Sequence, residues 1–599
     1  MIKPIEMTKV RIISPSSQVR HVIETLYDMK LLHIVDFHKG EEEFFDIGKP
    51  FKEAAIYSEQ LVDIRAVLYR LAISGAHRRM KNFHNAQKLF LEVNKKFKVI
   101  VSRLDKLKAD ENRLLEELKN PLIDLNISKD DIKDYKNLVV FTGTVKSPIE
   151  SKLSAITKDY ILTQAKIEKQ FAFVLYAKKG LAEKVKSVLS ESGFAEYEPP
   201  ILKQIDIGKN LSDIKNEISN LETQLESFKK EDSQFLLDYE HALTQLNEKA
   251  EAPLKFASSK STLIASGWIP SKAAESLRQN LSDTAKEKVS VEFLHGENPP
   301  TALENPKIAN KFEFFLNLYS LPKYYEIDPT ILMFITFPLF FGFMLGDVGY
   351  GLITLMIMLL LERMLPVDAK PLLRIVAISS LASIAFGFVF GEFFGREFTT
   401  PLINRVHDIN TMMMITIAVG IAHVNFGFIL GLINELKHHN FLTAFFRKGS
   451  WITLQIGAAL LGFGYMQANQ SLQAIGGLVA IGSVLMIING EGILRIIELP
   501  TLLSNILSYF RLYAIGLASV SFAVITNDLA AGFFSQGGFS LIIGVSILFL
   551  GHAMNLMLGL IGPFLHSLRL HYVEFFQKFY EGGGYRYSPF GIVKTLGGR

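Results

Sequence analysis

From about residue 330 onward, the chain consists of long apolar stretches that carry almost no formal charge. The hydrocarbon core of a bilayer is about 30 Å thick, so a helix that crosses it needs roughly 20 apolar residues. Residues 331–361 contain one formal charge, Asp347, which lies beside a cluster of glycines. We interpret this stretch as two helices that turn near Gly346 to Gly351. The second half of the chain is therefore expected to be an all-α membrane domain.

The other apolar stretches complete this domain. Residues 450–490 contain no Asp, Glu, Lys or Arg and are long enough for two helices, with a polar turn at Asn469-Gln470-Ser471. The remaining stretches are residues 373–391, 412–434, 499–524 and 541–574. Together, these apolar stretches predict about eight transmembrane helices, of which the last two are expected to be long and tilted. Eight spans place both termini on the same side of the membrane.

Loop charge predicts which side that is. Lys and Arg are enriched in the cytoplasmic loops of membrane proteins, and five basic residues fall in loops on the side of the first half: Lys370, Arg374, Lys437, Arg447 and Lys448. Arg396 and Arg405 fall on the opposite side. The N-terminal residues lack the apolar core of a signal peptide, and the chain has no cysteine. We therefore expect a multi-pass protein of the cell membrane with both termini in the cytoplasm.

The first half is rich in charge and is expected to be soluble and α+β. Residues 8–37, 137–177 and 261–293 each alternate between β-branched, strand-like runs and helical periodicity, which indicates small α/β lobes. Between the lobes, apolar residues recur at steps of three and four over about 51–119 and 208–250. Such a narrow stripe is typical of coiled-coil pairing. An antiparallel coiled coil that joins two lobes is the simplest arrangement. We expect a cytoplasmic domain over residues 1–325 and a membrane domain over 326–599.

Several classes of function are disfavoured by what the sequence lacks. There is no phosphate-binding loop of the Walker type, no cluster of metal-ligand residues and no nucleophile triad, so we expect no ATP site, cofactor or metal on this chain. Thiolate chemistry is excluded because cysteine is absent. The formal net charge of +4 over 599 residues does not indicate a nucleic-acid partner.

Two arginines within apolar stretches are the strongest functional signal. Arg511 lies about a dozen residues into its stretch and Arg569 lies in the last one; Asp528 is the only formal charge between them. A charge at the bilayer centre costs about 2.5–3.5 kcal/mol on insertion scales, so such residues usually face a partner or a wet cavity. The alternative is snorkelling to the interface, which suits Arg569 better than Arg511.

The helix faces around these arginines are polar and lined with small residues. His552, Asn555, His566 and Arg569 share one face at helical spacing, and Ser508 shares a face with Arg511. Small residues allow close approach of another helix. The faces therefore predict either tight packing within the chain or apposition to a partner helix that carries a carboxylate.

Titratable residues near the arginines are candidates for lining an aqueous path. Glu491 and Glu498 flank the start of the seventh span, Glu392 follows the third, and His423 lies within the fourth. Each residue also has a purely structural interpretation. The glutamates would then be interfacial charges, and His423 would be a core histidine bonded to a neighbouring helix. For Asp347, capping of the glycine turn is favoured over ion transport.

An arginine does not release its proton at working pH. It is therefore a poor relay but a good fixed counter-charge, because it stabilises the ionised form of a facing carboxylate. A carboxylate that moves past it on a partner would be forced to release its ion. Because neither arginine has an acidic residue at similar depth in the sequence, this carboxylate is expected on another protein.

At these residues the chain resembles the membrane stator subunit of V-type and archaeal A-type ATPases, called subunit a or subunit I. The matching motifs are Phe337-Pro338-Leu339-Phe340-Phe341-Gly342, Gly346-Asp347-Val348-Gly349-Tyr350-Gly351, Ser508-Tyr509-Phe510-Arg511-Leu512, residues 564–574 and residues 579–584. The resemblance implies a rotating membrane ring of small helical (c/K-type) subunits, peripheral stalk subunits (E/G-type) and a central-stalk or ring-adaptor subunit as partners. It also implies that Arg511 and Arg569 face the ring carboxylates, and that Glu498 and His423 line half-channels.

The chain departs from eukaryotic members at two positions. Ser519 stands where they often have a histidine, and Gly559 stands where they have an acidic residue before the second arginine. The ion route, and the choice of proton or sodium, therefore cannot be copied from them. Two other functions are alternatives. A self-contained secondary transporter would favour inverted repeats, which are not evident in this sequence, and a purely structural scaffold leaves Arg511 unexplained.

Overall fold

The computed structural model describes residues 4–38, 44–78, 80, 82–132, 135–167, 170–284, 288–366, 369–437 and 439–591. Contacts group the chain into two compact units, one formed by Phe51–Ala250 and the other by the first 50 residues together with the chain from Glu251 onward. The boundary between a soluble part at 1–325 and a membrane part at 326–599 is a division by composition and stays a prediction.

The first lobe is built from two segments that are far apart in the sequence. β1 (Met7–Pro15), α1 (Val19–Met29) and β2 (His33–Val35) combine with β9 (Thr262–Pro270), α7 (Ala274–Thr284) and β10 (Ser290–Leu294). The antiparallel sheet has the order β10-β1-β9, β2 pairs with the free side of β9, and the short strands β8 (Ala257–Ser258) and β3 (Asp46–Ile47) extend it. The segments at 8–37 and 261–293 thus form one lobe, because β9 pairs with both β1 and β2.

The other unit carries the second lobe and the helical arms. β4 (Leu138–Val145), α4 (Glu150–Ser154), β5 (Tyr160–Ile167), β6 (Gln170–Lys178), α5 (Ala182–Glu191) and β7 (Ala195–Glu196) form an antiparallel sheet in the order β5-β6-β4-β7. Its β-α-β-β-α-β succession is the split βαβ arrangement, which the first lobe shares. α5 covers the sheet with Val185 and Leu189, which are fully buried. The expected small α/β lobes are therefore present, and there are two of them.

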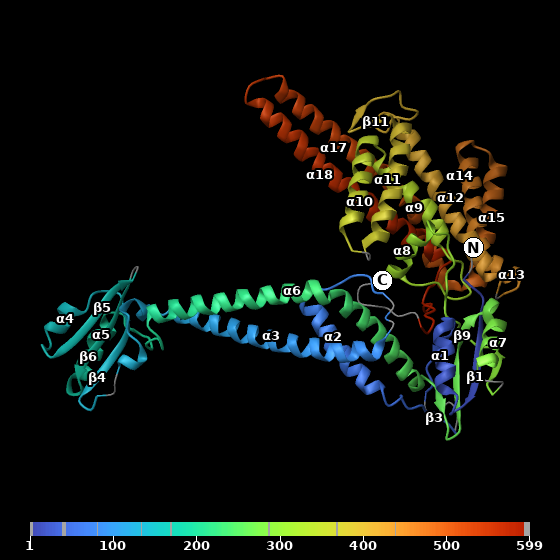
Figure 1. The fold of residues 1–599 in the computed structure, drawn as a ribbon. Helices are drawn as coiled ribbons and strands as arrows, with labels where there is room; N and C mark the ends of the chain where they lie inside the picture. Colours follow the sequence, from blue (N-terminus) through green and yellow to red (C-terminus); the bar gives the residue numbers. More distant parts are fainter. Residues whose placement is uncertain are drawn as a thin grey trace. The chain divides into compact units, whose positions relative to one another are not determined.

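Long antiparallel helices join this lobe to the rest of its unit. α3 (Phe83–Leu118) runs beside α6 (Gln204–Glu251), and α2 (Ala54–Arg70) packs against both (Figure 1). Leu107 packs against Ile218, and Leu114, further along α3, packs against Ile207, which comes earlier in α6. This opposite progression shows that the predicted coiled coil is antiparallel.

The apolar half is helical throughout its long segments. Helices occupy all eight expected places: α9 (Thr330–Leu345), α10 (Val348–Met364), α11 (Lys370–Phe390), α12 (Ile409–Glu435), α14 (Ser450–Met466), α15 (Gln470–Glu491), α16 (Leu499–Leu507) with α17 (Phe510–Phe534), and α18 (Ser540–Arg569). Among the described residues, five helical segments are long and apolar enough to cross a membrane. The chain is thus a membrane protein, and the count of eight spans stays a prediction. α17 and α18 pair as a hairpin that runs obliquely to α11 and α12 (Figure 1).

The turn between α9 and α10 lies where the glycine cluster predicted it. Gly346 ends α9 with φ +39°, in the left-handed region that glycine tolerates. Asp347 begins α10 by accepting a hydrogen bond from the Tyr350 N–H at 2.9 Å, and its other oxygen accepts one from the Gly395 N–H at 3.0 Å. The capping interpretation of Asp347 is therefore confirmed.

The first lobe is attached to one end of the membrane helices. The Met7 N–H donates to the Tyr324 hydroxyl at 2.9 Å, just before α9 begins. The C-terminal segment returns to the same lobe, where the Phe590 N–H donates to the Leu32 carbonyl at 2.8 Å and the Phe590 ring lies edge-on to Tyr27. We call this end of the helices the lobe end and the opposite end, which carries β11 (Glu392–Phe393) and β12 (Arg396–Glu397), the far end.

Candidate functional site

Arg511 has an acidic partner inside this chain. It lies in the first turn of α17, and its Nη1 is 3.6 Å from Oε1 of Glu574, whose side chain is 2% exposed. Buried charges in proteins are normally paired, because an unpaired one carries a large desolvation cost. The sequence argument that each arginine lacks an acidic partner is therefore wrong for Arg511.

A change of helix type explains why the sequence pattern missed Glu574. After α18 the chain continues as a π-helix over Leu570–Phe575. In an α-helix, positions five apart lie about 140° around the axis, which would turn Glu574 away from the face of Arg569. A π-helix closes its hydrogen bonds between residues five apart and so brings such positions toward one side. Glu574 thereby reaches Arg511 on α17.

Arg569 differs from Arg511 in its surroundings. It is the last residue of α18, is exposed and makes no ion pair within the described ranges. His566, one turn earlier on the same face, is partly exposed. Gly559 lies buried deeper on that face, where a Cβ would come within 2.9 Å of Leu345. The polar and small-residue face predicted for α18 thus packs within the chain at Gly559 and becomes open near Arg569.

An aromatic and histidine cluster packs around the Arg511 and Glu574 pair. Tyr509 is fully buried, and its hydroxyl lies 2.6 Å from Nδ1 of His423. His423 stacks on Phe575 with a centroid separation of 4.0 Å, and its Nε2 is buried without a hydrogen bond in the described residues. His571 lies 5.3 Å from His423 between ring centroids. His423 is thus bonded to a residue near the start of α17, as expected of a core histidine bonded to a neighbouring helix, and its partners Tyr509 and Phe575 lie close in the sequence to Arg511 and Glu574.

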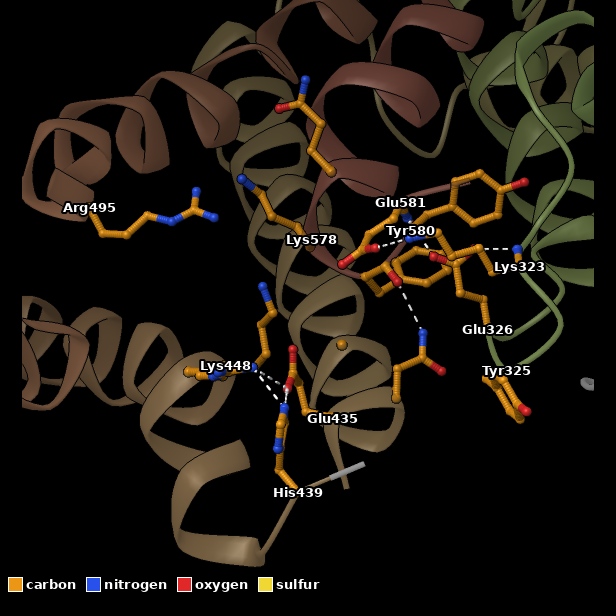
Figure 2. A pocket seen from close by; sticks show the side chains of 15 residues that line it. Lys323, Tyr325, Glu326, Glu435, His439, Lys448, Arg495, Lys578, Tyr580 and Glu581 are labelled. Atoms are coloured by element: carbon orange, nitrogen blue, oxygen red, sulfur yellow. Dashed lines mark hydrogen bonds and ion pairs between the residues drawn. The ribbon is translucent and has the colours of Figure 1, made fainter. Parts of the chain in front are cut away.

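A pocket of about 450 Å³ opens at the lobe end, and Figure 2 shows the side chains that line it. Its charged residues come from the segment before α9, the end of α12, the turn before α14, the turn after α15 and the segment after α18: Lys323, Glu326, Glu435, Arg447, Lys448, Arg495, Lys578 and Glu581. Arg447 pairs with Glu435 at 3.1 Å, whereas the Lys578 ammonium makes no ion pair in the part of the chain described. The lining is polar and suits water.

The acidic residues predicted near the seventh span lie beside this pocket. Glu491 and Glu498 line an adjoining pocket that shares Lys448, Arg495 and Lys578 with the first one. Glu491 pairs with Lys448 at 3.1 Å, and Glu498 pairs with Arg495. Both pockets are lined by Lys578, which follows Glu574 by four residues, so these polar spaces reach the chain segment next to the Arg511 and Glu574 pair.

A second polar cluster lies toward the far end. His552 Nδ1 is 2.6 Å from the Tyr350 hydroxyl, and Asn555 Nδ2 donates to that hydroxyl at 2.9 Å. His552 Nε2 lies 3.2 Å from Oδ1 of Asn527, and the Ser519 hydroxyl donates to Asn555 Oδ1 at 3.3 Å. The 14 residues from Asn555 to Arg569 span about 21 Å of helix. The two clusters thus occupy different depths.

Glu392 bonds to neither of these two clusters and pairs with Arg405 instead. Arg405, which is 1% exposed, donates from Nε to Glu392 Oε1 at 2.9 Å, and its Nη2 donates to the other oxygen. Arg405 also donates to the carbonyl oxygens of Met344 and Gly346. This pair therefore holds the far-end loop against the turn after α9.

The structure brings together most of the predicted residues in two groups. Arg511, Arg569, His566, His423 and Ser508 lie near Glu574, with Glu491 and Glu498 at the adjoining pocket, while His552 and Asn555 form the far cluster. The residues that sequence reasoning missed are Glu574, Tyr509, His571 and Tyr350. All four stand inside the motifs that carry the family resemblance, so polar residues within those runs were the available signal. No group of three metal-ligand side chains converges in the described ranges.

Comparison with known proteins agrees with the motifs. The model of the V-type ATPase 116kDa subunit family matches residues 32–399 and 498–592. The chain belongs to this family. Among similar proteins, A-type ATP synthase subunit I of Archaeoglobus fulgidus is 30% identical over the whole of both chains. Subunit I of the A-type ATP synthase of Halobacterium salinarum is 26% identical over 99% of each chain.

More distant members give the same family. V-type ATP synthase subunit I of Borreliella burgdorferi is 24% identical over 55% of this chain and 60% of its own. A crystal structure of the cytoplasmic N-terminal domain of subunit I, homolog of subunit a, of V-ATPase matches over 48% of this chain and its own full length, with 14% identity and a TM-score of 0.28. The family model and the full-length relatives confirm, at the level of the family, the resemblance to subunit a, or subunit I, stated from the motifs.

Proposed function

We propose that this protein is the stator subunit of a rotary A/V-type ATPase and provides two ion half-channels against a rotating ring of small helical subunits. The observation that carries the proposal is the pair of membrane arginines at the lobe-end termini of α17 and α18. Arg569 is exposed and lacks an ion pair within the described residues, and a charge in an apolar segment needs a partner or water. A carboxylate on a ring helix would supply that partner.

The two polar clusters would serve the two half-channels. The pockets beside Glu491 and Glu498 offer an aqueous route from the lobe end to the arginines. His552, Asn555 and Tyr350 offer polar groups toward the far end. Arg511 and Arg569 between these routes would repel a passing cation and force each ring carboxylate to exchange its ion, because an arginine stays charged.

The soluble part would connect the membrane domain to the ATPase head. The antiparallel coiled coil of α3 and α6 ends in a compact lobe, and rigid helical arms of this kind suit the anchoring of peripheral stalk (E/G-type) subunits. A central-stalk or ring-adaptor subunit is a further expected partner. The chain itself would be a non-catalytic subunit of the cell membrane, with both termini cytoplasmic; a secondary transporter or a scaffold is the alternative.

The test is ATP-driven ion uptake into vesicles that contain the reconstituted complex. Arg511→Ala is expected to abolish uptake while the complex assembles and the detached head still hydrolyses ATP. Arg363→Ala, at the exposed end of α10, is the matched control and is expected to keep uptake. Normal uptake by assembled Arg511→Ala complexes would refute the counter-charge mechanism. Uptake by this chain reconstituted without a ring would favour the transporter alternative.

A further inference from the structure

The Arg511 and Glu574 ion pair is loose for a buried contact. Its separation of 3.6 Å exceeds the range of an N–H to oxygen hydrogen bond. Arg511 Nη1 and Glu574 Oε2 are both buried and have no hydrogen-bond partner in the described residues. Nη1 is the Arg511 atom that faces Glu574, so this donor meets the carboxylate by charge and without a hydrogen bond, whereas buried donors are normally satisfied. The guanidinium is therefore held loosely enough to turn toward a second acceptor.

The cations around Glu574 determine whether this carboxylate can stay ionised while buried. Its nearest cations are Arg511, with which it is in contact, and Arg569, which makes no ion pair of its own in the described ranges. An ionised carboxylate that is 2% exposed needs an opposite charge close by. These three groups carry two positive charges and one negative charge, and Lys578 adds a further cation that interacts with Glu574, so positive charge remains for an external anion.

The position of Glu574 depends on a costly local feature. π-helical turns are rare and occur often at functional sites, and this one places the carboxylate opposite the first turn of α17. A plain α-helical continuation would direct the same side chain elsewhere. The chain thus builds a carboxylate against the arginine that, under the proposed function, also meets the ring carboxylates.

We infer that Glu574 is a resting counter-charge that holds Arg511 between ring carboxylates and competes with them for its guanidinium. This inference rests on the proposed function. When a ring carboxylate arrives, Arg511 turns toward it and loosens from Glu574. When the carboxylate must leave with a new ion, Glu574 takes the guanidinium back. Glu574 is a positioning residue in this scheme, since it acts on the ring only through Arg511.

The variant that tests this is Glu574→Gln, which keeps the size of the side chain and removes its charge. Without the competitor, Arg511 holds the ionised ring carboxylate more firmly. A nearby opposite charge lowers a carboxyl pKa by 1–3 units. If Arg511 lowers the pKa of the ring carboxylate by one further unit in the variant, that carboxylate needs a higher concentration of the coupling ion to bind it again. The coupling-ion concentration that gives half-maximal ATP-driven uptake is expected to rise about tenfold.

The experiment compares assembled complexes across proton and sodium concentrations at saturating ATP. Glu362→Gln is the matched control, because this glutamate pairs with Arg374 at the end of α10, and it is expected to leave the half-maximal concentration unchanged. If Glu574→Gln does not assemble, the same titration uses Glu574→Asp, whose carboxylate is one methylene further from Arg511. A shift in the same direction but smaller is expected for Glu574→Asp.

Two outcomes separate this inference from the function on which it rests. An unchanged half-maximal concentration in an assembled Glu574 variant, with Arg511→Ala inactive, overturns the inference and leaves the stator proposal intact. A uniform loss of uptake without a shift also overturns it, because that result indicates a structural role only. Normal uptake by Arg511→Ala overturns both.

Discussion

The buried pair of Glu392 and Arg405 allows a prediction whose magnitude follows from its contacts. In Arg405→Ala the Glu392 carboxylate stays buried without its cation, and the carbonyl oxygens of Met344 and Gly346 lose their donors. Removal of one partner of a buried ion pair costs about 3–5 kcal/mol. A loss of at least about 3 kcal/mol corresponds to a fall in melting temperature of roughly 6–12 °C, at about 2–4 °C per kcal/mol for a domain of 150–250 residues.

The double replacement is the decisive comparison. Glu392→Leu with Arg405→Met removes both charges and keeps similar volume, a change that is often neutral or stabilising at buried pairs. We expect the double variant to melt above either single variant in detergent. Additive losses in the double variant would refute the reasoning, since independent sites add. Ion uptake per assembled complex is expected to be unchanged in the double variant; its loss would instead support the half-channel role predicted for Glu392.

Two further predictions concern other parts of the molecule. Burial lowers the pKa of His33, and Lys255 lowers it further, against smaller opposing contributions from the Ser588 backbone and Asp36. Protonation therefore disfavours the buried position of this ring, whose Nδ1 accepts a hydrogen bond from the Ser588 N–H at 3.0 Å. The stabilisation of the docked C-terminal segment by neutral His33 is present above the usual pKa of 6.5 and is lost as the pH falls through the lowered pKa of the folded state. A spin label at Arg586→Cys should therefore become more mobile on acidification, and mobility that does not depend on pH would contradict this prediction. Gly476→Ala should destabilise the α14 and α15 pair, because the new Cβ would lie 2.4 Å from a backbone nitrogen. In the control Gly477→Ala the new Cβ would lie 3.7 Å from a side-chain methyl, so this variant should melt at or above the parent protein. Equal melting temperatures for the two variants would contradict the packing argument.

Local patterns in the sequence were sufficient for elements whose contacts are local. The steps of three and four in the arms required a partner stripe, and a single antiparallel pairing satisfied both arms. The glycine cluster with Asp347 predicted the turn after α9 because a left-handed glycine followed by an acidic cap is a local arrangement. The pairing of β9 with both β1 and β2 spans more than 200 residues of chain. No local pattern specifies such pairing, so the single first lobe was not foreseen.

The candidate site shows the same limit at the scale of one helix. Arg511, Arg569 and His423 were found because charge or a titratable ring in an apolar segment is costly wherever it lies. Glu574 was missed because periodicity arguments assume 3.6 residues per turn, and the chain departs from that value over Leu570–Phe575. Tyr350 and Tyr509 were missed because a tyrosine is compatible with an apolar core until its hydroxyl partner is known.

The two arginines therefore differ in what each requires from a partner. Arg511 has a compensating carboxylate within the chain, so its half-buried side chain has a partner before a ring is present. Arg569 has no such partner in the described residues and keeps part of its surface open at the end of α18. An arginine of that kind is stable only beside water or an external anion. The subunit alone would thus hold Arg511 in place, and Arg569 would find its partner only on assembly with the ring. Under the proposed function, this suits a stator subunit that folds before the ring docks.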